Sequence, residues 1–288
     1  MKTYLLIFLI FALSYPTGAQ QENLANNSEL KILSWNIKML PSIFVPSGKI
    51  RRSKRIAEQL QNLNYDIIIF QEAFHAQSRN IISKHLNNKY PYRYGPANKP
   101  WYSVKTNSGI WILSKIPLQI LHELDFCQCE KEDCFARKGA LMLQGNWNGN
   151  SFQIIGTHLE AGGPIAIKES QYLEIKEQLI DEYAQDSVPL FICGDMNTAL
   201  GSNLYNNMLS ILDATDGCLE GSITNTIDPV NNDMTQSDQS KVIDYFLVRN
   251  KTQKDISITR TVSVLKTRWS KKHEDLSDHF GVAAIIRF

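Results

Sequence analysis

The sequence has no excess of either charge. Its 30 Lys and Arg residues are matched by 29 Asp and Glu residues, which gives a formal net charge of +1. A protein that depends on non-specific nucleic-acid binding is usually more basic, although a small basic groove can be offset by acidic residues elsewhere. The composition therefore argues against a general nucleic-acid binder and leaves a nuclease open.

The sequence also lacks a hydrophobic segment long enough to cross a membrane. The apolar run at residues 4–13 follows Lys2 and is about half of the ~20 residues that a spanning helix needs. Thr17-Gly18-Ala19 then supplies the small residues that a signal peptidase reads. We expect a signal peptide over residues 1–19, cleaved near Ala19, and a secreted or periplasmic protein. No Cys follows the run, so a lipoprotein anchor has no support.

Cysteine is scarce, with five residues in the chain. Three of them, Cys127, Cys129 and Cys134, are close in sequence, and export favours a local disulfide. The sequence leaves open whether Cys134 pairs with Cys127 or Cys129, or whether Cys218 takes one of them. A zinc site is the rival interpretation, but no His or fourth Cys lies nearby at zinc-ligand spacing. Cys193 ends an apolar run and is predicted to be a buried free thiol.

No internal linker, low-complexity block or repeat divides the chain. Residues 20–29 are predicted to form a flexible leader and residues 30–288 a single domain. Helical periodicity indicates helices near 51–63 and 164–183. Strand-like runs occur in both halves, and Asn148-Gly149-Asn150 favours a hairpin between two of them. This order predicts an α/β fold of two packed sheets with outer helices.

Short polar motifs follow or interrupt these apolar runs. A strand that ends on a carboxylate, amide or imidazole places that group at the rim of a sheet, and several such rims together make a site for a hard metal and a phosphate. The motifs are Ser34-Trp35-Asn36, Phe70-Gln71-Glu72, Gly156-Thr157-His158-Leu159, Gly194-Asp195-Met196-Asn197, Ile243-Asp244-Tyr245-Phe246 and Ser277-Asp278-His279.

Glu72 follows the strand-like run 66–70, which contains three consecutive isoleucines, with Gln71 between them. A carboxylate there is suited to Mg²⁺, which prefers oxygen ligands and takes a substrate phosphate as a further ligand. Asn36 ends the first strand in the same way, and its amide is suited to orienting a phosphate oxygen or ligating the metal. The alternatives are a surface glutamate at a strand end and an asparagine that only terminates a strand.

Asp195 and Asn197 project from a turn after an apolar strand. Asp195 is suited to orienting a water for attack, and Asn197 to donating a hydrogen bond to the charge that develops on phosphorus. The alternative is a simple Asx-turn.

His279 titrates near neutrality and suits a general base. Asp278 cannot easily reach the ring of its own neighbour, because successive strand residues face opposite ways. We therefore expect Asp278 near the metal and Asp244 against the His279 ring. His158 is predicted to face the phosphate from another strand end. Of the remaining histidines, His75 is expected near Glu72, whereas the others are expected at the surface: His85, His122 and His273.

Together the motifs resemble the endonuclease/exonuclease/phosphatase superfamily, the fold of deoxyribonuclease I, over residues 30–288. The resemblance implies a four-layer α/β sandwich with one metal-dependent site at the top of two packed sheets. It implies metal binding by Glu72, with Asn36 and Asp278 nearby, and orientation of His279 by Asp244. It further implies catalysis by four residues: His158, Asp195, Asn197 and His279.

Within that superfamily, two branches match poorly. The AP-endonuclease branch has an Asn-containing turn where this chain has Thr157-His158-Leu159, although residues 243–248 look like that branch. The inositol-phosphate 5-phosphatase branch has a Trp-Cys-Asp-Arg-type signature, which is absent here.

Four segments are similar to neutral sphingomyelinases, namely residues 108–118, 134–140, 156–161 and 171–175. The resemblance implies that Lys138 approaches the active site, where a cation is suited to holding a phosphodiester. Secreted bacterial sphingomyelinases carry an acidic pair just before the glycine that matches Gly109, at a second metal site. This chain has Thr106 and Asn107 there, so no second metal is expected at that place. Three aromatic residues are predicted to be exposed for membrane contact: Trp101, Tyr102 and Trp269.

The sequence therefore predicts a secreted Mg²⁺-dependent phosphodiesterase, with Mn²⁺ or Co²⁺ as substitute ions. Its expected substrate is sphingomyelin or a related phospholipid at a membrane surface, cleaved to ceramide and a phosphorylated head group, with Lys138 and Asn36 binding the substrate. The first alternative is an extracellular endonuclease acting on nucleic acid, and the second is a catalytically silent binding protein of the same fold. No protein partner is inferred.

Overall fold

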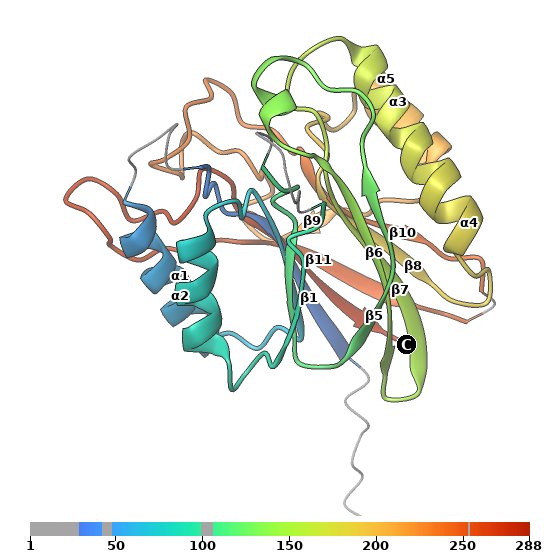
Figure 1. Ribbon diagram of the computed structural model, residues 1–288, viewed down its shortest axis with the longest axis horizontal. Coiled ribbons are helices and arrows are strands. Elements are labelled where there is room, and N and C mark those ends of the chain that lie inside the picture. The colour runs from blue at the N-terminus through green and yellow to red at the C-terminus, as the bar shows by residue number, and fades with distance from the viewer. Residues whose placement is uncertain (1–28, 42–47, 99–105, 253) are drawn as a thin grey trace, which may run out of the picture.

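The computed structural model describes residues 29–41, 48–98, 106–252 and 254–288 (Figure 1). The predicted signal peptide lies outside the described residues, as do Trp101 and Tyr102. The first strand begins at Glu29, and residues 20–28 of the predicted leader also lie outside the described residues. Within the described part of the chain, no helix has the length and apolar character to cross a bilayer.

Seven strands form one mixed sheet in the order β3-β4-β2-β1-β12-β11-β9. The central strands β1 and β2 are parallel, and β1 pairs antiparallel with the last strand, β12. The bounds are β1 Glu29–Asn36, β2 Ile67–Gln71, β3 Tyr92–Tyr94, β4 Trp111–Ser114, β9 Leu219–Glu220, β11 Ser257–Ser263 and β12 Gly281–Arg287.

Five strands form the second sheet in the order β10-β8-β7-β6-β5. The predicted hairpin joins β6 to β7 through Asn148 and Gly149, which both have positive φ. β7 and β8 are parallel, so the chain between them must cross over the sheet. The bounds are β5 Leu118–Asp125, β6 Gly139–Trp147, β7 Asn150–His158, β8 Leu190–Asp195 and β10 Asp244–Arg249.

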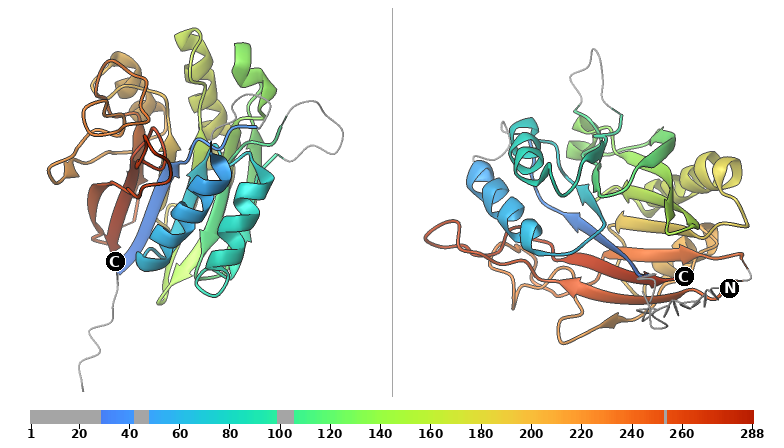
Figure 2. Two further views of the ribbon diagram at one scale, coloured as in Figure 1. Left: turned by 90° about the vertical axis from the view of Figure 1, so that its left-hand side faces the viewer. Right: turned by 90° about the horizontal axis from the view of Figure 1, so that it is seen from below.

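That crossover is the predicted helix, which runs as α3 Ile165–Ile175, a π-helical turn Lys176–Ile180 and α4 Asp181–Tyr183. Together with α5 Asn203–Ile211 it lies on the outer face of the five-stranded sheet. The helices α1 Lys49–Asn62 and α2 Ala76–Leu86 lie on the outer face of the seven-stranded sheet (Figures 1 and 2). A short 3₁₀ helix, η1, covers Lys131–Phe135. The predicted four-layer α/β sandwich is confirmed.

Three hydrophobic cores separate these layers. Tyr172 and Met208 pack under the outer helices of the five-stranded sheet, and Ile56 and Ile82 do the same on the other side. The core between the sheets is built from β-branched and aromatic side chains of both, including Ile32, Ile67, Ile69, Ile154, Phe191 and Phe246.

Gly156 lies on β7 at a close approach between the sheets. A Cβ atom there would stand 2.8 Å from Cγ2 of Ile69 on β2, closer than real Cβ contacts allow. The absence of a side chain at Gly156 therefore lets β7 and β2 pack closely. Since the site described next draws residues from both sheets, this spacing matters for its geometry.

Candidate active site

The motif-bearing strand ends of the two sheets meet at one edge of the sandwich. Asn36 ends β1, and Glu72 follows β2 with a left-handed φ of 53°. In the other sheet, His158 and Asp195 are aligned at the ends of the parallel strands β7 and β8. Asp244 begins β10 directly opposite Asp195, because these two strands are antiparallel.

Asn36 links the two sheets at this edge. Its buried Nδ2 donates to Oε1 of Glu72 at 3.0 Å and to Oδ2 of Asp195 at 3.0 Å. Its Oδ1 accepts from the backbone N–H of Lys38 at 3.1 Å, which fixes the orientation of the amide. In this arrangement Asn36 orients two carboxylates, and its predicted part in binding a metal or a phosphate stays a prediction.

His279 and Asp244 form a buried pair. Nδ1 of His279 lies 3.2 and 3.0 Å from the two carboxylate oxygens of Asp244, and the residues are 9% and 2% exposed. Burial alone would lower the pKa of His279, but the carboxylates of Asp244 and Asp195 outweigh it and raise that pKa well above the usual value. Nε2 of His279 is 3.8 Å from Oδ2 of Asp195. The ring therefore has the support and orientation that a general base needs.

Asp195 stands at the centre of the site. Burial raises its pKa to about 7, and the nearby charge of Asp244 adds to this effect. Its Oδ1 accepts from the backbone N–H of Asn197 at 2.9 Å. Nε2 of His158 is 3.7 Å from Oδ2, and burial, with Lys138 and His279, lowers the pKa of His158 well below its usual value. His158 is therefore neutral near pH 7.

Asn197 adopts a left-handed φ of 48° just after β8. Its Nδ2 donates to the backbone carbonyl of Leu159 at 3.0 Å, so the amide is directed at the chain segment beside His158. Donation to a phosphate oxygen, as predicted, would require this bond to be exchanged.

Lys138 reaches the same carbonyl from the other side. Its buried Nζ donates to Leu159 O at 2.8 Å and lies 2.9 Å from Oδ2 of Asp133. Asp133 is in turn hydrogen-bonded to the carboxyl group of Glu160, a residue that is 1% exposed. Sequence reasoning missed both acids. Both acids lie next to features that the sequence does reveal, because Glu160 follows the Thr-His-Leu motif and Asp133 lies within the cysteine cluster.

The donors at this edge fit a divalent cation. Desolvation raises the pKa of Glu72, and the neighbouring charge of Asp278 raises it further, which is a repulsion that a cation would relieve. Asp278 already holds an ammonium group, since Nζ of Lys38 lies 2.6 Å from its Oδ2. A divalent ion bound here would have Glu72 as its nearest carboxylate candidate, with Asp278 beside it, and both would offer the oxygen ligands that Mg²⁺ prefers.

One further group has the spacing of metal ligands. Among the described residues, Asp195, Asp244 and His279 are the one set of three whose candidate ligand atoms all lie within 4.8 Å of one another. Within this set, Asp244 and His279 are hydrogen-bonded to each other, an arrangement that is also suited to proton transfer.

A cleft of about 280 Å³ opens onto this machinery. Its polar lining residues are Glu72, Thr106, Asp133, Lys138 and His158. Its apolar lining includes Phe74 and Phe135, and Phe135 is 53% exposed. A cleft that combines apolar and charged lining residues suits a substrate with a polar group attached to an apolar body.

Comparison with known proteins agrees with this geometry. The pattern of the Endonuclease/Exonuclease/phosphatase family matches residues 33–279. The chain belongs to this family. Sphingomyelinase C of Leptospira interrogans is 29% identical and aligns with 95% of this chain but 55% of its own length. The chain thus spans about half the length of such relatives. Phospholipase C of Staphylococcus aureus is 25% identical and aligns with 96% of this chain and 93% of its own.

Solved structures show the same family fold. A crystal structure of beta toxin from Staphylococcus aureus superposes with a TM-score of 0.80 at 24% identity, covering 88% of this chain and 99% of the other. A variant of that toxin with bound magnesium ions gives 0.79 at 23% identity, with 89% and 99% covered. TDP2 of D. rerio, complexed with a single-strand DNA product, gives 0.67 at 16% identity, with 91% and 100% covered.

His75 caps α2, where its side chain accepts from the backbone N–H of Ser78. Its expected place near Glu72 stays a prediction, whereas the expectation for Trp269 was wrong. Trp269 is partly buried rather than exposed, because its ring stacks on His273 and its Nε1 donates to the backbone of Asp275 at 2.7 Å.

The cysteine alternatives are also resolved. Cys129 pairs with Cys134, while Cys127 and Cys218 are exposed free thiols. The disulfide leaves no cysteine pair in this cluster for zinc. Cys193 is a buried free thiol, as predicted.

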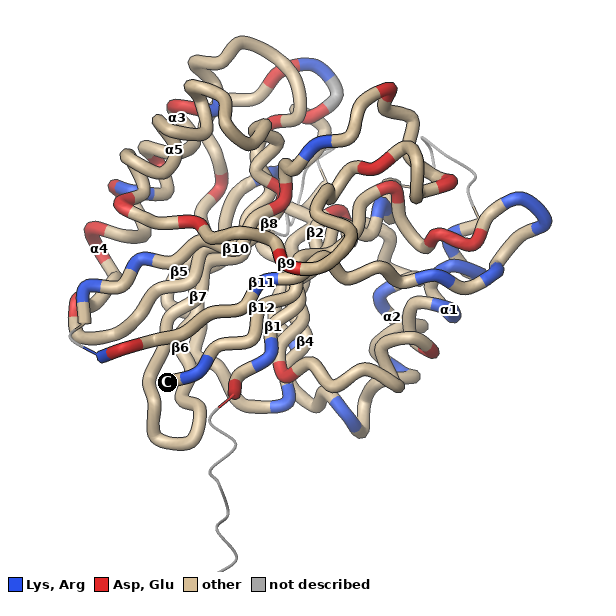
Figure 3. The backbone as a smooth tube through the Cα atoms, turned by 180° about the vertical axis from the view of Figure 1, so that it is seen from behind, with Lys and Arg blue, Asp and Glu red and all other residues tan. Residues whose placement is uncertain are grey.

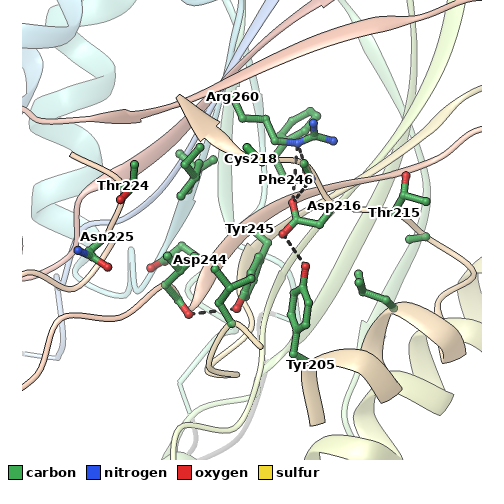
Figure 4. Close-up of a pocket in the computed structure, with 17 residues that line it drawn as sticks. Tyr205, Thr215, Asp216, Cys218, Thr224, Asn225, Asp244, Tyr245, Phe246 and Arg260 are labelled. Atoms are coloured by element: carbon green, nitrogen blue, oxygen red, sulfur yellow. Dashed lines mark hydrogen bonds and ion pairs between the residues drawn. The ribbon is translucent and has the colours of Figure 1, made fainter. Parts of the chain in front are cut away.

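A second cavity, of about 680 Å³, is lined by Asp244 and by residues of α5, β10 and the segment 214–219 (Figure 4). It is mostly apolar. Tyr205, Asp216 and Arg260 form a linked cluster in its wall, in which the hydroxyl of Tyr205 donates to Asp216 at 3.0 Å.

Proposed function

We propose that this protein is a secreted, divalent-metal-dependent phosphodiesterase that hydrolyses sphingomyelin or a related phospholipid to ceramide and a phosphorylated head group. The observation that carries the proposal is the cleft, in which apolar side chains and the polar side chains of Glu72, Lys138 and His158 line the same space. The sphingomyelinase and phospholipase relatives support it.

Each polar residue of the site has its own role in the proposed reaction. Glu72, beside Asn36 and Asp278, would hold Mg²⁺, which supplies charge neutralisation at a phosphate oxygen. His279 removes a proton from the attacking water at Nε2, and Asp244 stabilises the imidazolium through Nδ1–H. Asp195 orients that water. As the water oxygen bonds to phosphorus, the bond from phosphorus to the lipid oxygen breaks, and the departing oxygen takes a proton from solvent to leave as the alcohol. His158 and Asn197 stabilise the negative charge that grows on the phosphate oxygens, and His279 later returns its proton to solvent.

A set of parallel assays tests the substrate. Purified protein with Mg²⁺ is compared on sphingomyelin vesicles, phosphatidylcholine vesicles and plasmid DNA. We expect release of phosphorylated head group from sphingomyelin, abolished by a chelator. Turnover of plasmid alone would contradict the lipid proposal, and no turnover of any phosphodiester would indicate a silent binding protein.

The cleft itself is tested with Phe135→Ala. The exposed Phe135 stands at its mouth, so this variant should lose turnover on vesicles but keep turnover of a water-soluble phosphodiester. Ile120→Ala is a matched control, because Ile120 is an exposed apolar residue of β5 that does not line the cleft. Equal losses on both substrates would show that Phe135 does not serve lipid access.

A nuclease remains the second candidate, because two observations favour it. One is the fold shared with TDP2. The other is a basic surface along α1 and the loop packed against it (Figure 3). Nucleic-acid binding at this surface would weaken steeply with added salt. The exposed residues of this surface are Arg51, Lys54, Arg55, Arg268, Lys271 and Lys272.

A further inference from the structure

The disulfide closes a short acidic loop whose contacts the proposed reaction does not explain. Cys129 and Cys134 are five residues apart, and Glu130 and Asp133 lie between them. The loop packs against the segment after β7, where the backbone N–H of Ala161 donates to Oδ2 of Asp133 at 2.8 Å. The disulfide thereby holds two carboxylates of one segment next to Glu160 of another.

A cavity of about 200 Å³ lies between these two segments. One wall comes from the disulfide loop and includes Glu130 and Asp133. The opposite wall comes from Glu160 and the backbone of residues 161–163. Two glycines form part of that wall, so main-chain groups rather than side chains face the space.

Two carboxylate oxygens at this cavity are buried without a partner. Oε2 of Glu160, a residue that is 1% exposed, has no hydrogen-bond partner among the groups that the structure describes. Oε2 of Glu130 is in the same condition. It lies against Gly163, where an added Cβ would stand 2.5 Å from it. A buried carboxylate oxygen without a partner is costly, so two of them at one small cavity indicate a missing positive ligand.

The nearby lysines do not supply that ligand. Lys138 pairs with Asp133 and with a main-chain carbonyl. Lys131 lies 3.8 Å from the other oxygen of Glu130 and is exposed. Nζ of Lys168 is 3.5 Å from the carbonyl of Ala161. None of them makes a hydrogen bond to either orphaned oxygen.

We propose that this cavity binds a calcium ion, held by the carboxylates of Glu130 and Glu160, with water and main-chain carbonyl oxygens completing its shell. The choice of ion follows from the donors. They are all oxygen, and the two sulfurs nearby are consumed in the disulfide, which disfavours zinc and copper. Calcium accepts irregular shells with main-chain carbonyls and water, whereas magnesium demands a near-ideal octahedron.

This site is separate from the proposed catalytic metal at Glu72, and the experiment must keep the two apart. Calcium binding is measured by titration calorimetry on the full chain carrying Glu72→Gln, which weakens the catalytic site. We expect one calcium ion with a dissociation constant on the order of 10⁻⁴ to 10⁻³ M, the range of extracellular calcium modules. Adding Glu160→Gln should weaken this binding at least tenfold.

Glu177→Gln is the matched control, because Glu177 is an exposed glutamate on the crossover helix and does not line the cavity. In the Glu72→Gln background it should leave calcium binding unchanged. Equal binding with and without Glu160→Gln would overturn the proposal, as would the absence of calcium binding by the Glu72→Gln protein.

Thermal unfolding separates loss of the site from loss of the fold. With a chelator present, Glu160→Gln should unfold at the same temperature as its parent or higher, since the substitution removes a buried carboxyl group whose Oε2 has no hydrogen-bond partner. Calcium at high concentration should raise the parent's Tm by several degrees and leave that of Glu160→Gln unchanged. A Tm gain that is equal in both proteins would contradict the site.

Discussion

Replacing Asp244 by Asn tests the assignment of His279 as the base. The substitution keeps the size of the side chain and removes the charge that faces Nδ1 of His279 at 3.0 Å. A hydrogen bond to a charged group contributes ~1.5–3 kcal/mol, and its loss in the transition state corresponds to a roughly 10- to 150-fold lower kcat. An Asn amide that faces Nδ1 with its own N–H would favour the wrong tautomer and add to this loss.

The same change has a predicted effect on pH dependence. Asp244 helps to raise the pKa of His279, so Asp244→Asn lowers that pKa. The base is active when neutral, and the acid limb of the kcat profile should therefore move to lower pH even though the plateau falls. The assay is kcat on sphingomyelin vesicles across a pH series with saturating Mg²⁺, with thermal unfolding as a check on the fold.

Asp213→Asn is the matched control, because Asp213 makes a surface ion pair with Arg249 at the other end of β10. It should leave both kcat and the pH profile unchanged. If Asp244→Asn stays within about twofold of the parent and its acid limb does not move, the reasoning for the His279–Asp244 pair is refuted.

Three further outcomes are expected. In the metal-free protein, the pKa values of Asp195 and His279 are higher in the folded state than in the unfolded state, so the folded state binds more protons. The free energy of unfolding therefore falls as pH rises, from about 4 to 7 for Asp195 and above about 6.5 for His279. Mg²⁺ should accordingly raise Tm more at pH 8 than at pH 6. Asn197→Ala should lower kcat by about 10²–10³ if the amide serves the transition state, and an unchanged kcat would remove it from the mechanism. Gly194→Ala should lower Tm and activity much more than Gly149→Ala. A Cβ at Gly194 would lie 1.9 Å from the carbonyl oxygen of Thr157, whereas a Cβ at Gly149 would meet no atom within 4 Å. Similar Tm values for the two variants would contradict this account.

Much of the fold could be predicted because strands and helices depend largely on local sequence patterns. The apolar run before Asp195 and the turn at Asn148-Gly149 each depend on a few adjacent residues. Strand ends also indicated which polar side chains come together, since Asp195 and Asp244 each sit at the end of an apolar run.

The contacts between segments far apart in sequence could not be predicted in the same way. The link from Asn36 to both Glu72 and Asp195 depends on the packing of two sheets. Trp269 was expected at the surface because nothing in its own segment shows that His273 and Asp275 bind it. The choice of Cys129 over Cys127 for Cys134 likewise depends on the path of the loop.

The acids Asp133 and Glu160 show the same limit at the site itself. Each lies beside a motif that was recognised, yet only the folded chain reveals that both adjoin Lys138. The sequence shows which residues carry a charge, whereas the residue that pairs with each charge is set by the tertiary structure.

The close approach of the sheets at Gly156 makes catalysis dependent on the interior of the sandwich. Glu72 belongs to one sheet, Asp195 to the other, and Asn36 holds both at 3.0 Å. A larger residue at Gly156 would push against Ile69 and displace one sheet relative to the other. Distances at the rim would change by tenths of an ångström, enough to disturb reacting groups but little enough for the fold to tolerate. Evolution could therefore adjust turnover through buried hydrophobic residues that touch neither metal nor substrate.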